Sequence, residues 1–319
     1  MSPSRYRMLT ATSVLLALAA GVVVGAGASG MRASGAPSSG AELAERVAEL
    51  EAERAELRER LGGAEEFGAS VGPLVVRDVL AGRSVLLVTT GDVEDAEASS
   101  VAALVEAAGG RVAGGVGMTE DLVDGRRADQ LRELARRLLP AGASLPAGGD
   151  PGSLAGALLA SLLVVDPVTG EPRSEEVERE VALTALAEAG FLRASEPVPP
   201  AELVLVLTGA GVGTAAGDVT GGTVRERSQL LRAVVSELAR VGRGVVVAGP
   251  PASADADGLV GVVRTDAGTR TRVSTVDTLG GGEGSAVAVL ALRAAWEGEV
   301  GHFGGAGNAG RRSPLAPGT

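Results

Sequence analysis

The chain has 319 residues, of which 45% are hydrophobic and 22% charged, with a formal net charge of −11; this length suits one large domain or two small ones. All 29 basic residues are Arg, Cys is absent and His occurs once, which excludes Walker loops, lysine Schiff bases, thiolate sites and any site needing two His residues. The Arg residues are scattered among Glu without forming a basic stretch, which argues against nucleic-acid binding.

The N-terminal segment predicts a membrane anchor within residues 1–30. Residues 9–28 form an uncharged run, and at about 1.5 Å per residue roughly 20 helical residues cross a hydrocarbon core of about 30 Å. Arg5 and Arg7 precede this run, which predicts a cytoplasmic N-terminus and an extracytoplasmic body. A cleaved signal peptide is the alternative, because Ala-Gly-Ala at 26–28 has the form of a cleavage site. Both interpretations export the body of the protein.

Residues 31–40 are expected to form a linker, and residues 41–66 a short coiled coil. Ser39 and Glu42 have the spacing of a capping box, so a helix is expected to begin there. Seam positions then recur at alternating intervals of four and three residues, which is the spacing of a heptad repeat with Leu at d. The expected contacts to a second helix or partner are Leu43, Val47, Leu50, Arg54, Leu57 and Leu61.

Charged residues beside this seam favour a parallel homodimer. In the same register, each g residue of one helix meets the e residue five positions further on in its partner. The alternative is a solitary helix whose charges form a solvated face. All three g–e pairs are opposite in charge: Arg46 with Glu51, Glu53 with Arg58, and Arg60 with Glu65.

Residues 67–305 are expected to fold as a layered α/β domain with a mostly parallel sheet. Short runs rich in Val and Leu, closed by Gly, Thr or Pro, are typical of buried parallel strands, and helical patterns alternate with them. The tail at 306–319 is expected to be disordered. The expected strands are 85–89, 111–116, 203–207 and 244–248, and the expected helices are 95–108, 126–139, 151–164, 174–189 and 225–241.

Three groups of residues could form a ligand site, and each also has a purely structural interpretation. The loop at 208–213 is rich in Gly, but the sequence after it opens no helix to hold a pyrophosphate. His302 is expected to pack or cap, and hydrolase activity is not expected, since a Ser-His-Asp triad would have to use this single His. Carboxylates near strand ends could hold Mg²⁺ or Ca²⁺, although helix caps and turns account for them more simply: Asp92, Glu94, Asp95, Asp255, Asp257 and Asp277.

Motifs at both ends of the chain resemble one known family. Val-Ser-Thr-Val-Asp at 273–277 is followed by a helical pattern around 287–292 and by Gly-His-Phe-Gly at 301–304. The N-terminal half adds Tyr6-Arg-Met, the membrane run, the short coiled coil and Gly-Arg-Ser-Val-Leu-Leu-Val at 82–88. Together these features resemble the actinobacterial MctB family, the mycobacterial copper transport protein B group, in which Tyr is commoner at the position of Phe303. The motif residues, without an assigned role, are Ser274, Thr275, Asp277, Gly301, His302 and Gly304.

The resemblance implies a non-enzymatic membrane protein of the cell envelope that takes part in copper homeostasis and is described as a channel-forming copper transporter. Related corynebacterial members imply an alternative: a dimeric extracytoplasmic scaffold that works with an envelope protein partner and regulates cell division or a peptidoglycan hydrolase through the coiled coil. One membrane helix per chain does not line a pore, which favours this alternative physically. No cofactor is expected.

The residues themselves do not suggest a copper site. Cu(I) prefers thiolate and thioether ligands, and the chain has no Cys and four Met residues. Three of the Met residues lie at or beside the membrane run, and Met118 is far in sequence from His302. We therefore expect the domain from about residue 72 to 305 to bind Cu(I) no better than a generic protein surface, with any effect on cellular copper arising indirectly.

Overall fold

The computed structural model describes residues 39–146, 149–194, 197–210 and 224–315. The chain divides into two units, Met1–Arg60 and Leu61–Thr319. The predicted membrane anchor and most of the predicted linker lie outside the described residues. Within the described ranges, no helix is both long and apolar enough to span a bilayer.

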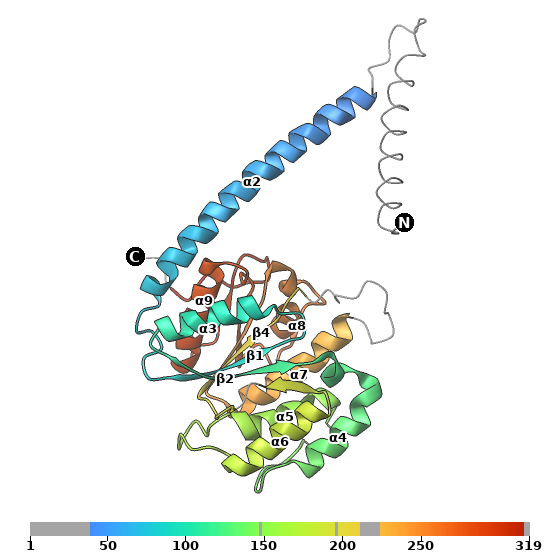
Figure 1. The fold of residues 1–319 in the computed structure, drawn as a ribbon, viewed down its shortest axis with the longest axis vertical. Coiled ribbons are helices and arrows are strands. Elements are labelled where there is room, and N and C mark those ends of the chain that lie inside the picture. Colours follow the sequence, from blue (N-terminus) through green and yellow to red (C-terminus); the bar gives the residue numbers. More distant parts are fainter. Residues whose placement is uncertain (1–38, 147–148, 195–196, 211–223, 316–319) are drawn as a thin grey trace, which may run out of the picture. The chain divides into compact units, whose positions relative to one another are not determined.

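Helices and strands alternate along most of the described chain (Figure 1). The α-helices are α2 (Ser39–Val75), α3 (Asp95–Ala107), α4 (Ala128–Arg137), α5 (Pro151–Leu163), α6 (Glu176–Glu188), α7 (Val224–Val241), α8 (Leu259–Thr265) and α9 (Gly282–Trp296). The strands are β1 (Ser84–Thr89), β2 (Arg111–Met118), β3 (Leu192–Ala194), β4 (Leu203–Leu207), β5 (Gly244–Ala248), β6 (Val273–Val276) and β7 (His302–Phe303). The short 3₁₀ helices are η1 (Glu120–Val123), η2 (Gly125–Arg127) and η3 (Pro251–Ala254).

The strands form one seven-stranded sheet in the order β3-β2-β1-β4-β5-β6-β7. All neighbouring pairs are parallel except β2 with β3, which is an antiparallel pair at the edge. Counted in chain order, the central parallel strands follow the 2-1-3-4-5 pattern of doubly wound folds, in which the chain direction across the sheet reverses between β1 and β4. The predicted α/β class with a mostly parallel sheet is therefore confirmed.

Helices cover both faces of this sheet, so its central strands are buried throughout. In β4, Val204 and Val206 pack into a core with α5, α7 and α8, whereas Leu203, Leu205 and Leu207 pack into a second core with α3 and α9. This alternation follows from the opposite directions of successive side chains in a strand, and it explains why the strand is continuously apolar. Figure 1 shows α3 and α9 on one side of the sheet and α5 and α6 on the other.

Helix α2 continues beyond residue 66, where the coiled coil was predicted to end. The helix runs through Gly62 and Gly63 without a break, because a helical Gly costs only about 1 kcal/mol. The following turns gain packing, because the Cβ position of Gly68 lies 2.9 Å from the backbone N of Glu283 at the start of α9. Tertiary contact therefore stabilises the helix up to Val75.

The C-terminal segment contradicts the prediction of a disordered tail as far as residue 315. Backbone N of Gly304 donates to the carbonyl of Arg311 at 3.0 Å, and Asn308 Nδ2 donates to the carbonyl of Ala254 at 2.9 Å. These contacts hold the segment against the body of the domain. Residues 316–319 lie outside the described ranges.

Candidate functional site

Pairing of β6 with β7 brings the two C-terminal motifs together at one end of the sheet. Thr275 lies opposite His302 in the parallel register, and Thr275 Oγ1 is 3.0 Å from His302 Nδ1. One residue earlier, the backbone N of Gly301 donates to Ser274 Oγ at 3.2 Å. Residues that are 27 positions apart in sequence thus form one polar cluster.

A buried arginine from α8 joins this cluster. Arg264 Nη1 lies 2.6 Å from Asp277 Oδ2, and the two side chains are only 2% and 1% exposed. Arg264 Nε also donates to Thr275 Oγ1 at 2.8 Å, and Nη2 donates to the carbonyl of Phe303 at 2.8 Å. A charge taken out of water requires such partners, so the guanidinium and the Asp277 carboxylate stabilise each other.

The same carboxylate anchors the chain after β7. Asp277 Oδ1 accepts from the backbone N of Gly305 at 2.7 Å, and Arg264 Nη1 reaches Asn308 Oδ1 at 2.7 Å. Gly304 has φ +136°, and a Cβ there would stand 2.0 Å from Asp277 Oδ1. Only glycine fits this position without displacing the ion pair.

His302 belongs to the same cluster. Burial, followed by the charge of Arg264, lowers the pKa of His302 below its ordinary value of 6.5, and a backbone hydrogen bond with Arg270 opposes that change. Because Nδ1 is engaged by the hydroxyl of Thr275, the ring is tied to the sheet through that nitrogen.

A second polar site lies where the strand order reverses, at the carboxyl ends of β1 and β4. Thr90 Oγ1 donates to Asp92 Oδ1, and the same carboxylate oxygen accepts from the backbone N of Gly209 at 3.2 Å. The hydroxyls of Thr90 and Thr208 are 3.4 Å apart. Ligands of doubly wound sheets bind at this place, and here the structure has a cavity of about 70 Å³, to which Met118 and Arg227 also contribute. We call it the switch-point cavity.

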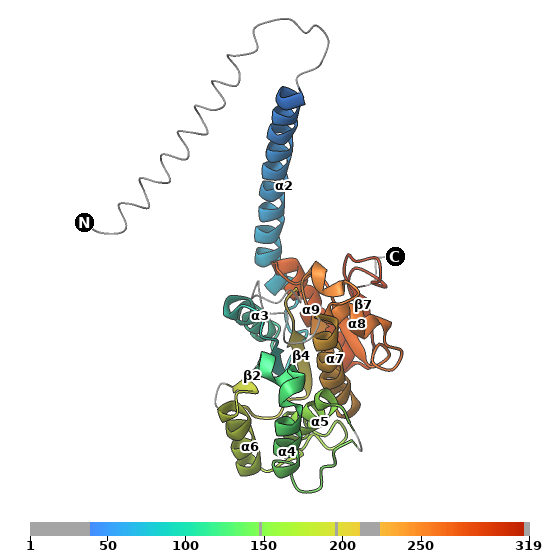
Figure 2. The ribbon, with the colours of Figure 1, turned by 90° about the vertical axis from the view of Figure 1, so that its right-hand side faces the viewer.

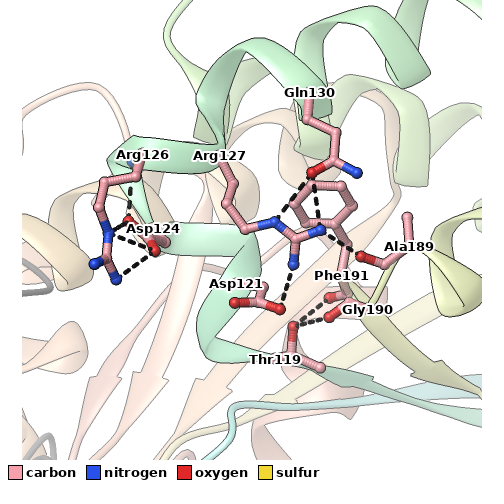
Figure 3. A network of polar contacts seen from close by, with 9 residues as sticks. All are labelled: Thr119, Asp121, Asp124, Arg126, Arg127, Gln130, Ala189, Gly190 and Phe191. Carbon is pink, nitrogen blue, oxygen red and sulfur yellow. Dashed lines mark hydrogen bonds and ion pairs between the residues drawn. The ribbon is translucent and has the colours of Figure 1, made fainter.

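Thr119, which lines the switch-point cavity, belongs to the polar network drawn in Figure 3. Thr119, which follows β2, donates its hydroxyl to the carbonyls of Gly190 at 2.6 Å and Phe191 at 2.9 Å. Arg127 pairs with Asp121 and places its guanidinium carbon 4.5 Å from the centre of the Phe191 ring. Its Nη2 donates to the carbonyl of Ala189 at 2.6 Å. The network connects the end of β2 to the turn after α6.

The six predicted carboxylates do not form one cluster. Asp277 pairs with Arg264, Asp257 pairs with exposed Arg225 at 3.2 Å, and Asp92 lies at the switch-point cavity. The remaining three lie at helix ends: Glu94 is the N-cap of α3 and Asp95 its first residue, and Asp255 is the C-cap of η3. Within the described residues, no group of three His, Asp or Glu side chains is arranged to hold a metal ion. Of the predicted glycine loop, residues 211–213 lie outside the described ranges.

The two most suitable copper ligands of the domain, Met118 and His302, lie on strands that are far apart in the sheet. Met118 ends β2 and His302 begins β7, and these strands are separated by five inter-strand steps in the sheet order. At about 4.8 Å per step, the two residues are roughly 24 Å apart. They cannot share one metal ion within a single chain.

The predicted coiled-coil seam is exposed along α2. The five apolar residues of the seam are 53–64% exposed: Leu43, Val47, Leu50, Leu57 and Leu61. Arg60 makes an intrahelical ion pair with Glu56 at 2.6 Å. This pair competes with the predicted pairing of Arg60 with Glu65 of a second helix.

Comparison with known proteins identifies the relatives of this chain. The profile of a family described as copper transport outer membrane protein, MctB, matches residues 1–314. This chain belongs to the MctB family. Curated proteins named copper transporter MctB from Mycobacterium bovis and Mycobacterium tuberculosis are 33% identical to it over 306 residues, covering 94% of the chain and 95% of each relative. A protein of the same name from Mycobacterium leprae is 34% identical over 225 residues and covers 68% of both chains.

The motif that indicated MctB membership is therefore the polar cluster around the buried ion pair. The two motifs contain Thr275, Asp277 and His302, whereas Arg264 lies outside them and was not predicted to belong to the site. A single Arg ending the apolar run Leu-Val-Gly-Val-Val at 259–263 was the available signal, since a charge in a buried element needs a partner. In this MctB chain the cluster joins α8, β6, β7 and the C-terminal segment.

Proposed function

We propose that this chain acts in copper transport across the cell envelope, as a non-enzymatic, membrane-anchored protein with an extracytoplasmic body. The observation that carries the proposal is the family match over residues 1–314. Because the match covers 95% of the length of the relatives from Mycobacterium bovis and Mycobacterium tuberculosis, the chain includes counterparts of nearly all their sequence. The uncharged run at 9–28 supports the anchor.

In this proposal the α/β body contributes to transport without forming a copper site of its own. The full chain has no Cys, and Met118 and His302 lie five strand steps apart. A single membrane helix does not line a pore, so passage of the ion requires several chains or a further protein. The body therefore acts as the extracytoplasmic part of a larger assembly.

The exposed seam of α2 supports a homodimer as the basic unit of that assembly. Leu50 and Leu57 are 58% and 57% exposed, and burying an exposed Leu contributes about 1.5–3 kcal/mol. Two chains anchored in one membrane already share direction, which favours the parallel pairing that the g–e charges allow. The alternative of a scaffold that regulates division draws on the same seam, but each relative reported above carries the name of a copper transporter.

The test measures cell-associated copper in the source organism after deletion of the gene. We expect the copper content, measured by elemental mass spectrometry at a growth-permissive copper dose, to differ at least about twofold from the parent, and the wild-type gene to restore it. A Met118→Leu, His302→Ala double variant should restore it equally well. Unchanged copper content after deletion would refute the proposal.

A further inference from the structure

A surface groove runs along α3 in the unit formed by residues 61–319. It has a volume of about 630 Å³ and lies between α3, the last turns of α2 and the start of α9. Figure 2 shows the elements that border it. We call it the α3 groove. Its lining includes Gly72, Ala96, Ser100, Ala103, Ala107 and Gly282.

The floor of the α3 groove has the spacing of a helix-packing face. Ala96, Ser100, Ala103 and Ala107 recur at intervals of four, three and four residues, and all four are exposed. Residues at this spacing lie on one face of a helix, and from Ala96 to Ala107 they cover about 16 Å, or three turns. Such small side chains let a second helix approach closely.

The chain already uses this kind of contact beside the groove. A Cβ on Gly282 of α9 would lie 2.2 Å from the backbone N of Ala69 in α2, so these two backbones touch where both residues are small. The small face of α3 continues the same surface, and in the described part of the chain no third helix covers it.

The rim of the α3 groove is acidic. Glu94 and Glu97 line it and no Arg does, while Glu65 borders it at Gly281. Burial, then the neighbouring charges of Glu94 and Asp92, raise the pKa of Glu97. A cationic occupant of the groove would gain from the carboxylates that border it, those of Glu65, Glu94 and Glu97.

We propose that the α3 groove is a docking site for a basic helix of a partner protein, which presents small residues to α3 and Arg or Lys side chains to the acidic rim. A three-turn floor suits a helix rather than a small molecule, and the rim selects positive charge. A second copy of this chain, with its net charge of −11, complements the rim poorly. The inference does not depend on copper transport.

The test measures binding of a defined probe to the full-length chain in detergent micelles. The probe is a fluorescent helical peptide of about 15 residues with Ala at every third or fourth position and Arg on both flanks, and the control peptide has Glu in place of Arg. Ala103→Trp fills the groove from an exposed position. Ser99→Trp is the matched control, because Ser99 is exposed on the same helix but does not line the groove.

We expect saturable, salt-sensitive binding of the Arg probe in fluorescence anisotropy, weakened at least about tenfold by Ala103→Trp and less than about twofold by Ser99→Trp. Glu97→Gln should weaken it about threefold without altering the circular dichroism spectrum. Equal binding of the Glu peptide, or no difference between the two Trp variants, would overturn the proposal. Sedimentation showing that Ala103→Trp dissolves a dimer without any peptide would overturn it in favour of self-association.

Discussion

The buried ion pair between α8 and β6 should carry a large share of the stability of the domain. Replacing Asp277 by Asn removes the charge that neutralises Arg264, whose side chain is 2% exposed. Removal of one partner of a buried pair costs about 3–5 kcal/mol. Because Nε and Nη2 keep Thr275 and the carbonyl of Phe303 as acceptors, we expect the lower end, about 3 kcal/mol. Arg264→Met should cost a similar amount, since it leaves the carboxylate buried.

The combination of both changes distinguishes a coupled pair from two independent losses. In the double variant neither charge is left unpaired, so its cost should fall at least about 2 kcal/mol below the sum of the single variants. Urea unfolding of the full-length chain, followed by circular dichroism, gives the three free energies. Glu297→Gln is the control: its pair with Arg293 is about half exposed and should contribute less than about 1 kcal/mol. Costs that add within about 0.5 kcal/mol would refute the coupling.

Three further predictions concern pH, assembly and copper. The lowered pKa of His302 means that the unfolded chain binds a proton at this residue more readily than the folded chain does. The stability that His302 contributes above its ordinary pKa is therefore lost as the pH falls from 6.5 through the folded pKa. Urea midpoints should fall less over this range in His302→Gln, and identical profiles would contradict this. Leu50→Asp with Leu57→Asp should abolish the proposed dimer and leave the circular dichroism spectrum of the α/β domain unchanged, and sedimentation equal to the parent would count against the coiled coil. Competition with a Cu(I) chelator should detect no stoichiometric binding by the purified chain; tight binding lost on changing Met118 and His302 would restore a direct copper site.

The central strands could be predicted from the sequence because each is apolar throughout. The predicted ranges 203–207 and 244–248 coincide with β4 and β5, since strands buried on both faces leave an uninterrupted Val and Leu signal. In contrast, β6 reads Val-Ser-Thr-Val, and its hydroxyls serve the polar cluster. The helix α8 has seven residues, and β7 has two. Elements this short leave little periodicity to detect, and they are held by tertiary contacts.

The candidate site was only partly predictable for a related reason. Asp277 was considered as a metal ligand, because a carboxylate at a strand end favours a hard cation as readily as a guanidinium. Its partner Arg264 is 13 positions earlier on a helix that the pattern did not show. The helix α3 was predicted from the sequence, but the exposure of its small residues depends on how α2 and α9 pack beside it.

The location of the ion pair near the end of the chain has a consequence for biosynthesis. Phe303 lies in the same core as Val85 from the first strand, and Asn308 completes the contacts of Arg264, so the domain closes only after almost the whole polypeptide has emerged. Folds that depend on such distant contacts form slowly. A nascent chain that cannot finish folding early stays extended for longer, and such a delay would suit the extracytoplasmic body that we propose, which has to cross a membrane before it folds.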